Sequence, residues 1–267
     1  MTYALKTIAT LVGAHCAGRC EQQVDWLLTD SRSLCFPETT LFFALQTARG
    51  DGHHYIPELY RRGVRSFVVT SVPAGDYGEA SFLLVPDTLQ ALQRLAERHR
   101  DAFDIPVIGI TGSNGKTTVK EWLYQLLSPD CVVTRSPRSY NSQIGVPLSV
   151  WSMDGRSQLA LFEAGISQPG EMAALQRIIQ PTIGVFTCLG PAHQENFRSM
   201  EEKCREKMLL FKDADVIIYP DGDPVVARVL HESGYGGRLV PWHSSGDAMQ
   251  DDRHVCAAVC RCLGMDE

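Results

Sequence analysis

Short apolar runs and amphipathic stretches divide the chain into two segments. In the first, clusters of β-branched and aromatic residues predict strands at 26–29, 40–45, 66–70 and 82–85. Apolar residues at helical spacing predict helices at 6–16 and 55–62. We therefore expect residues 1–86 to form a small α/β domain, followed by a linking helix within 87–104.

In the second segment, residues 105–267, apolar strands alternate with amphipathic helices. The strands are expected at 107–110, 131–134, 159–162, 183–188 and 216–219, and the helices at 117–127, 171–179 and 200–211. Such alternation predicts an α/β domain with a mainly parallel sheet flanked by helices. Ligands of these sheets bind beyond the carboxyl ends of the strands.

Composition narrows the function classes. The 267 residues carry a formal net charge of −6, which does not favour nucleic-acid binding. No apolar run is long enough to span a membrane, and the N-terminus does not resemble a signal peptide. The nine cysteines include a pair at 16 and 20 and a group at 256, 260 and 262. Their helical spacing favours buried thiols over a zinc site, and a reducing cytoplasm fits them best.

A glycine-rich turn follows the strand Val-Ile-Gly-Ile and precedes a helix. Its residues are Thr111, Gly112, Ser113, Asn114, Gly115, Lys116, Thr117 and Thr118. Backbone N–H groups in such a turn bind phosphate, the lysine reaches the outer phosphates, and the threonine hydroxyl holds Mg²⁺. The general phosphate-loop pattern is not met, because Ile110 stands six residues before Lys116. The order of strand, loop, Lys-Thr and helix still favours a nucleotide site over a simple helix-capping turn, so we expect residues 105–267 to resemble a phosphate-loop NTPase domain.

Two further strand ends carry metal-type ligands. Glu163 directly follows an apolar strand, and His193 follows the strand predicted at 183–188. Mg²⁺ prefers hard oxygen ligands and often takes one or two carboxylates. Taken alone, Glu163 is better explained as a helix cap or a solvated turn residue, and a lone His is more often structural than functional. Three strand ends that point to the same rim favour a metal site.

Lys207 lies on the apolar stripe of a predicted helix. Ser199 and Glu202 form a capping-box pattern that begins this helix, and Lys207 shares a face with Cys204 and Phe211. An inward lysine is costly unless it is paired or neutral. The pattern leaves three alternatives open: an ion pair, with Glu163 as one partner, a neutral reactive amine, or a side chain that reaches past the core edge to solvent.

Together these motifs resemble the Mur ligases of peptidoglycan synthesis. The family's variant phosphate loop is similar to Thr-Gly-Ser-Asn-Gly-Lys-Thr-Thr at 111–118, and its metal-binding Glu, metal-binding His and carbamylated Lys match Glu163, His193 and Lys207. The resemblance implies ATP as a cosubstrate and two Mg²⁺ sites. Thr117 and Glu163 would bind the first ion, and His193 with carbamylated Lys207 the second. It also implies that Lys116, His193 and Lys207 are catalytic.

The resemblance extends to substrate binding. Stretches 30–32, 41–45 and 49–53 resemble the family's domain for the uridine nucleotide, and Ser31, Arg32, Arg49 and Asn141 are the implied substrate contacts. Stretches 112–121, 141–148 and 163–172 resemble the D-alanyl-D-alanine-adding members most. The implied partners are UDP-N-acetylmuramoyl tripeptide and D-alanyl-D-alanine, joined through an acyl phosphate. The competing member is the ligase that adds the third residue of the stem peptide.

Two departures from the family concern the end of the chain. Family members carry a third domain that grips the incoming amino acid or dipeptide, and the sequence to Glu267 shows no match to it. The adenine-contacting Asn of the family is not assigned either. We expect residues 105–267 to be an incomplete central domain of a cytoplasmic monomer. A plain NTPase or kinase, and a module that binds UDP-sugar and ATP without catalysis, remain alternatives.

Overall fold

The structure is a computed structural model that describes residues 1–48 and 50–265. It divides into two compact units, one ending at His99 and the other starting at Arg100. The division falls at the end of helix α3 (Thr88–Arg100), within the segment for which the sequence predicts a linking helix.

The first unit is built on a five-stranded sheet with the strand order β2-β9-β8-β5-β4. Strand β2 runs antiparallel to β9, and the other neighbours are parallel. The sheet strands are β2 (His15–Ala17), β4 (Trp26–Leu28), β5 (Thr40–Phe43), β8 (Ser66–Val69) and β9 (Ser81–Leu84). Two short ribbons add β1 (Tyr3–Ala4) with β3 (Gln23–Val24), and β6 (Gln46–Thr47) with β7 (Gly50–Asp51). The helices are α1 (Leu5–Val12), α2 (Ile56–Arg61) and α3.

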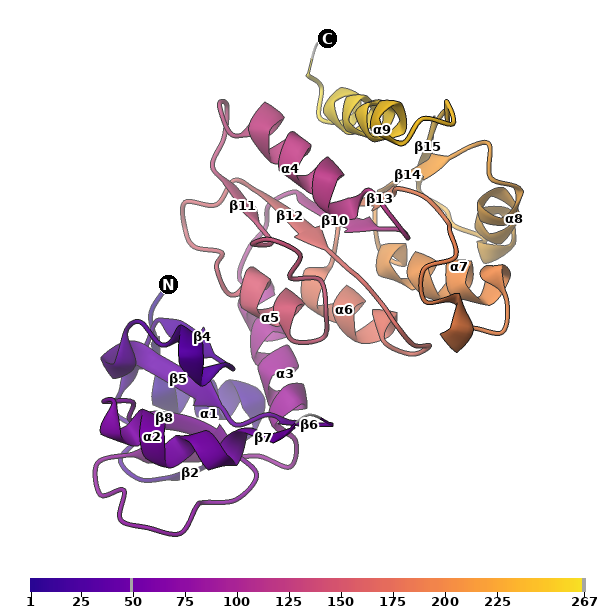
Figure 1. The fold of residues 1–267 in the computed structure, drawn as a ribbon. Coiled ribbons are helices and arrows are strands. Elements are labelled where there is room, and N and C mark those ends of the chain that lie inside the picture. Colours follow the sequence, from indigo (N-terminus) through magenta and orange to yellow (C-terminus); the bar gives the residue numbers. More distant parts are fainter. Residues whose placement is uncertain (49, 266–267) are drawn as a thin grey trace. The chain divides into compact units, whose positions relative to one another are not determined.

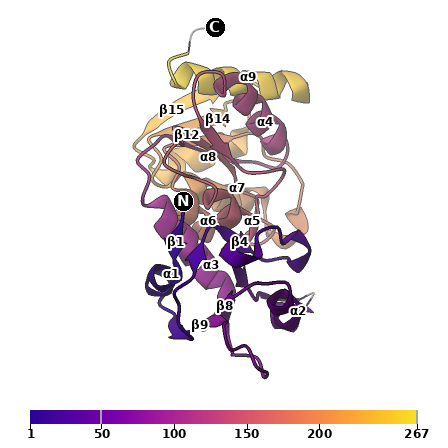
Figure 2. The ribbon, with the colours of Figure 1, turned by 90° about the vertical axis from the view of Figure 1, so that its left-hand side faces the viewer.

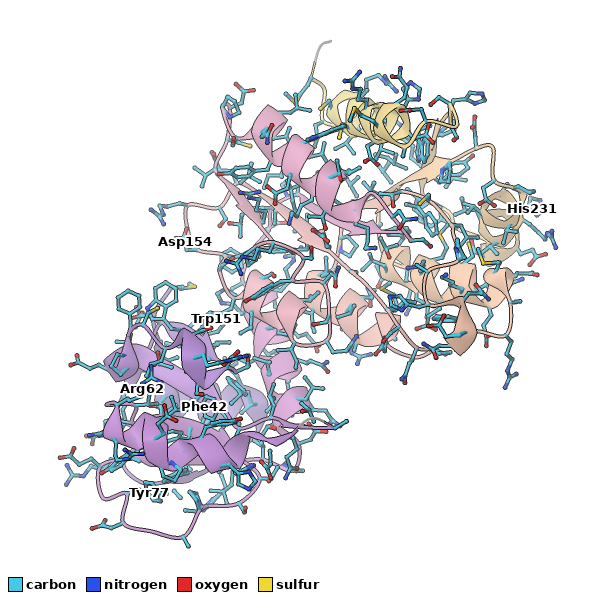
Figure 3. All side chains as sticks on the ribbon, in the orientation of Figure 1. Phe42, Arg62, Tyr77, Trp151, Asp154 and His231 are labelled. Carbon is cyan, nitrogen blue, oxygen red and sulfur yellow. A yellow bond between two sulfur atoms is a disulfide. The ribbon has the colours of Figure 1, made fainter. Side chains whose placement is uncertain are left out.

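Aromatic side chains fill the core of this unit. Phe42 (Figure 3) meets Phe67 edge to face, and Phe67 stacks on Phe82 with 5.4 Å between ring centroids. All three side chains are buried, which explains why the aromatic and β-branched runs of the sequence form strands here.

Part of the sequence prediction for the first unit is wrong. Helix α1 ends at Val12 because Gly13 takes a left-handed conformation with φ +69° and caps it. Cys16 therefore lies in strand β2 and forms a disulfide with Cys20, whereas helical spacing predicted two buried thiols.

The second unit contains a six-stranded, fully parallel sheet with the order β11-β12-β10-β13-β14-β15 (Figure 1). Its strands are β10 (Val107–Thr111), β11 (Val133–Arg135), β12 (Leu159–Glu163), β13 (Ile183–Phe186), β14 (Val216–Pro220) and β15 (Arg238–Trp242). This confirms the predicted parallel α/β domain. Strand β10 lies in the middle, so the loop that follows it emerges between the ends of β12 and β13.

Helices cover both faces of this sheet. They are α4 (Lys116–Leu127), α5 (Gly145–Val150), α6 (Met172–Ile179), α7 (Met200–Met208), α8 (Pro224–Ser233) and α9 (Ala248–Cys262). Figures 1 and 2 show α4 and α9 side by side on one face, where Val119, Leu123, Val255 and Val259 join the strand side chains in one core. On the other face, a Cβ atom on Gly184 would lie 2.3 Å from the Phe211 ring, so the chain after α7 approaches the sheet closely.

Two helices of the second unit differ from the prediction. Helix α7 ends at Met208 and continues to Phe211 as a 3₁₀ turn. Helix α4 buries Lys120 on its inner face, whereas the apolar side chain of Leu126 is 49% exposed. None of the helices among the described residues is long and apolar enough to cross a membrane.

Candidate nucleotide-binding site

The loop between β10 and α4 has a backbone that requires glycine at two positions. Gly112 and Gly115 have φ angles of +144° and +79°, a region that L side chains rarely adopt. A Cβ atom on Gly112 would lie 2.0 Å from the Thr187 hydroxyl, so there is no room for a side chain. Gly115 is the N-cap of α4, whose first-turn N–H groups have no acceptor inside the helix and can bind an anion.

Lys116 turns back over this loop. Its ammonium donates hydrogen bonds to the carbonyls of Gly112 at 2.8 Å and Ser113 at 3.3 Å. Burial lowers the pKa of Lys116, and the nearby Glu163 carboxylate opposes this shift. The amine is therefore held at the loop, within reach of any phosphate that the loop binds.

Glu163 stands beside the loop because β12 pairs with β10, with Ile110 directly opposite Glu163. The Thr117 hydroxyl donates to Glu163 Oε2 at 3.0 Å, and the Asn141 amide lies 3.5 Å from the same oxygen. The other oxygen, Oε1, is 2.9 Å from Lys120 Nζ, and both side chains are fully buried. The partner of Glu163 is therefore Lys120, so the pairing of Glu163 with Lys207 that the sequence left open is wrong.

Lys207 reaches the loop from the other side. It is 3% exposed, and its amine donates to the Gly112 carbonyl at 3.1 Å, the same oxygen that Lys116 contacts. Burial, reinforced by the charges of Lys116 and Lys203, lowers the pKa of Lys207 to about 7. A substantial fraction of this amine is uncharged at neutral pH, which favours the reactive-amine alternative over an ion pair or a solvent-reaching side chain.

A cavity of about 180 Å³ joins these groups. His193 lies on its rim in a left-handed conformation with φ +59° and is exposed. The other residues that line the cavity come from the phosphate loop, from the segments after β11, β12 and β13, and from α7: Gly112, Ser113, Lys116, Asn141, Ser142, Gly165, Ile166, Ser167, Ala192 and Lys207. Glu163 adjoins this set through Asn141, whose amide lies 3.5 Å from its carboxylate.

The oxygens of Thr117 and Glu163 suit Mg²⁺. A hydroxyl and a carboxylate 3.0 Å apart beside a phosphate loop form a hard-oxygen donor set. The second set, His193 and Lys207, suits a cation only if Lys207 becomes a carbamate, because the free amine is a hydrogen-bond donor to Gly112. The described residues contain no group of three or more His, Cys, Asp or Glu side chains that could hold a metal ion.

The remaining sequence-predicted residues fall in different places. Asn114 and Thr118 are exposed in the phosphate loop and the first turn of α4. In the first unit, Ser31 is buried in a 3₁₀ turn and Arg32 is exposed and paired with Asp30. Arg49 lies outside the described residues. Asn141 belongs to the second unit, beside Glu163.

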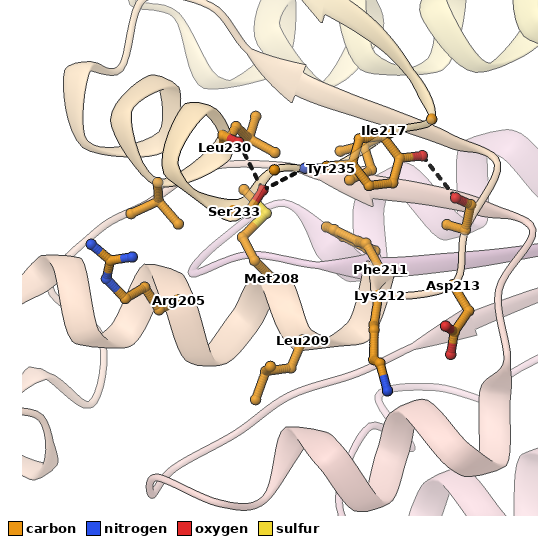
Figure 4. Close-up of a pocket in the computed structure, with 15 residues that line it drawn as sticks. Arg205, Met208, Leu209, Phe211, Lys212, Asp213, Ile217, Leu230, Ser233 and Tyr235 are labelled. Carbon is orange, nitrogen blue, oxygen red and sulfur yellow. Dashed lines mark hydrogen bonds between the residues drawn. The ribbon is translucent and has the colours of Figure 1, made fainter.

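A larger hollow of about 560 Å³ lies elsewhere in the second unit (Figure 4). It is bounded by the end of α7, by α8 and by the turn before β15, where the Tyr235 hydroxyl donates to the Ala214 carbonyl. Ile217 lines it near the start of β14, whereas the phosphate loop lies beyond the carboxyl ends of the strands. Its lining contains none of the predicted site residues.

Sequence reasoning missed three charged residues around the loop. Lys120 and Lys203 are buried lysines on α4 and α7. Asp252 on α9 lies so close to the loop that a Cβ atom on Gly115 would be 2.4 Å from its carboxylate oxygen. Burial raises the pKa of Asp252 to about 6. Lys120 lies three and seven residues before the buried Leu123 and Leu127, and Lys203 lies seven residues before the buried Leu210, so a closer count of each helix face could have found them.

Comparison with known proteins agrees with this geometry. Residues 110–238 match the Mur ligase middle domain. The second unit therefore contains a Mur ligase middle domain. The matched residues include the phosphate loop, Glu163, His193 and Lys207.

Two relatives carry the same enzyme name. The UDP-N-acetylmuramoyl-tripeptide–D-alanyl-D-alanine ligase of Bacillus subtilis is 33% identical over 228 residues, which are 83% of this chain and 49% of the relative. The Treponema pallidum enzyme of the same name is 34% identical over 251 residues, which are 89% and 54% of the two chains. The chain thus spans about half the length of these relatives.

Solved structures show the same fold. A crystal structure of MurF from Acinetobacter baumannii covers 100% of this chain and 66% of its own, with a TM-score of 0.91 and 21% identity. MurF from Thermotoga maritima in complex with ADP covers 90% of this chain and 63% of its own, with a TM-score of 0.76 and 23% identity. At these identities the match concerns the fold alone.

Proposed function

We propose that this chain carries the nucleotide and acyl-phosphate half of an ATP-dependent amide ligase that adds D-alanyl-D-alanine to UDP-N-acetylmuramoyl tripeptide in the cytoplasm. The observation that carries the proposal is the cavity that joins Lys116, His193 and Lys207 beside the Thr117–Glu163 pair. The curated relatives named for this reaction support the choice of substrates over the ligase for the third stem-peptide residue.

In the proposed reaction, an oxygen of the tripeptide carboxylate attacks the γ-phosphorus of ATP, and ADP leaves. The D-alanyl-D-alanine amine then attacks the acyl carbon, phosphate leaves, and the amine loses a proton to form the amide. Two like-charged reactants must meet in the first step, so the protein's main contribution is positioning and charge neutralisation.

Different residues of the chain would bind the phosphates, the metal ions and the substrate. Lys116 and the N–H groups that begin α4 would hold the phosphates, and Lys116 would exchange its contact with the Gly112 carbonyl for a phosphate oxygen. Thr117 and Glu163 would hold one Mg²⁺, and His193 with carbamylated Lys207 would hold a second. When bound, these ions neutralise charge on the reacting oxygens. Ser31, Arg32, Arg49 and Asn141 would contact the substrate.

Carbamylation of Lys207 is the part of the proposal most specific to this site. The reaction needs an uncharged amine, which attacks CO₂ and releases a proton as the carbamate forms. The pKa of about 7 for Lys207 makes that amine available at neutral pH. We expect Lys207→Ala to lose activity and to recover part of it when short carboxylates are added, and absence of any rescue would argue against the carbamate.

Phosphate release with UDP-N-acetylmuramoyl tripeptide, with and without D-alanyl-D-alanine, separates the possibilities. A ligase releases phosphate and forms amide only with both substrates. A plain NTPase or kinase turns over ATP regardless of the tripeptide, and a binding module turns over none. Lys116→Ala should lower ADP formation by about 100-fold or more. ATP turnover that survives in this variant would refute the assignment of the loop.

A further inference from the structure

Lys203 is a buried lysine to which the proposed reaction gives no role. It lies one turn before Lys207 on α7 and is 1% exposed. Its ammonium donates hydrogen bonds to two backbone carbonyls, to Gly190 at 2.6 Å and to Ala192. Among the described residues, no ion pair joins Lys203 to a carboxylate, and burial lowers its pKa.

The two carbonyls belong to the loop that carries His193. This loop connects β13 to α7, and Gly190 and Ala192 flank the proline that precedes the turn to His193. His193 itself has φ +59°, a conformation that a non-glycine residue adopts only when its surroundings hold it there. Lys203 therefore fixes the backbone immediately before the predicted metal ligand.

The same loop is bonded to the phosphate loop. The Ser113 hydroxyl donates to the Gly190 carbonyl at 3.0 Å and accepts from the Gly190 N–H at 2.8 Å. The Ser113 N–H also donates to the Cys188 carbonyl at 2.8 Å. The Gly190 carbonyl thus accepts hydrogen bonds from both Ser113 and Lys203, and it connects α7 to the turn that would bind phosphate.

An apolar side chain would fill the place of Lys203 at a lower desolvation cost. It would not satisfy the two carbonyls, which would then lose their charge-assisted hydrogen bonds. The lysine therefore contributes order to the loop and not an obvious gain in stability.

We propose that Lys203 is a positioning residue that clamps the loop from Cys188 to His193 onto the phosphate loop through the Gly190 carbonyl. It acts on nucleotide through Ser113 and His193 and does not contact the nucleotide itself. This inference rests on the proposed nucleotide function, and it adds a residue that neither the sequence motifs nor the proposed reaction includes.

The test uses Lys203→Met, which keeps the length and apolar stem of the side chain and removes the ammonium. Without nucleotide, backbone hydrogen exchange in the segment 188–193 should become at least about tenfold faster, because the loop loses the free energy of about one net hydrogen bond. Affinity for ADP with Mg²⁺, measured by calorimetry, should fall by about tenfold, while the melting temperature stays within a few degrees. Lys212→Met, at an exposed lysine after α7, is the matched control and should change neither the exchange rate nor the affinity for ADP.

A double-mutant cycle with Ser113→Ala distinguishes a clamp from a general packing effect. Because Ser113 and Lys203 meet at one carbonyl, the double variant should bind ADP no more weakly than about the weaker single variant. Fully additive losses, or loop exchange in Lys203→Met equal to the wild type, would overturn the proposal. If Lys203→Met does not fold, Ser113→Ala alone must still accelerate exchange at 188–193, and unchanged exchange there would overturn it as well.

Failure of the nucleotide proposal gives a different result. In that case the wild-type chain binds no ADP, while exchange at 188–193 still reports whether Lys203 holds the loop. The failure of one hypothesis can therefore be told apart from the failure of the other.

Discussion

The two sides of the phosphate loop accommodate buried lysines in opposite ways. On the β12 side, Lys120 is fully buried and lies 2.9 Å from the carboxylate of Glu163, which is also fully buried. On the α7 side, Lys203 and Lys207 are as deeply buried but bond to backbone carbonyls. Lys120 also lies 3.0 Å from a carboxylate oxygen of Glu121 and donates to the Ser136 carbonyl, so it has two carboxylate partners. The two α7 amines have no carboxylate partner among the described residues, and they lose their protons more easily than an ordinary lysine.

This difference distinguishes a lysine with a structural role, Lys120, from a lysine suited to a reaction, Lys207. A buried pair is costly to break, so Lys120 fixes the Glu163 carboxylate beside Thr117. A buried amine without a carboxylate is costly to keep charged, so Lys207 is prepared for a reaction that needs a neutral amine. Three predictions test this contrast.

The largest effect is expected at the ion pair. Lys120→Met leaves Glu163 buried without its partner, and we expect the free energy of unfolding to fall by about 3–5 kcal/mol. Urea denaturation at pH 7 measures this, with Lys212→Met as a surface control that should change it by less than about 0.5 kcal/mol. A loss below about 1 kcal/mol would show that the pair does not fix the site.

A smaller and pH-dependent effect is expected at Lys207. Its folded-state pKa of about 7 is below the unfolded value of 10.5, so the unfolded chain binds the extra proton between these values. Wild-type stability relative to Lys207→Met should therefore rise from pH 7 toward pH 10, by at most about 1.4 kcal/mol per pH unit. Below pH 7 the difference should be constant. Denaturation of both proteins across this range measures the difference. If their free energies of unfolding change with pH in the same way, the neutral-amine assignment is contradicted.

The smallest effect is expected at Asp252, the carboxylate over Gly115. Burial, with a contribution from Asp251, raises its pKa to about 6 from 3.8, so the folded chain binds the proton more tightly and wild-type stability falls as the pH rises between these values. Asp252→Asn should therefore stabilise the chain at pH 7 and not below pH 4. Because solvent reaches part of the side chain, the gain should be about 1 kcal/mol or less. Thermal unfolding at pH 4 and pH 7 measures it, and an equal gain at both would contradict the titration.

The sequence predicts the site well where a motif and a strand end coincide. The order of β10, loop and α4 follows from a glycine-rich turn between an apolar run and an amphipathic helix, and the parallel sheet then places Glu163 opposite Ile110. Lys207 was singled out because it interrupts an apolar stripe. These inferences needed only local spacing and one topological rule.

The rest depends on tertiary contacts. Which residue of α4 pairs with Glu163 depends on how the helix is rotated against β12. The apolar pattern of α4 does not fix this rotation, because it includes Leu126, which is exposed in the structure. Helices α5 and α9 and strand β15 were missed because their apolar positions are mixed with cysteine, glycine and proline. Helix α8 was missed although Asp223 caps its start, Gly234 ends it, and its buried apolar residues have helical spacing. Strand β2 was missed because Gly13 ends α1 early.

A crystal structure of the chain with Mg²⁺ and a non-hydrolysable ATP analogue tests the central claim most directly. The account predicts the triphosphate along Gly112–Thr118, the Lys116 ammonium moved from the Gly112 carbonyl to a phosphate oxygen, and a metal ion between Thr117 and Glu163. It also predicts His193 and Lys207 on the γ-phosphate side. A nucleotide bound at another surface, with Lys116 still on its own loop, would contradict it.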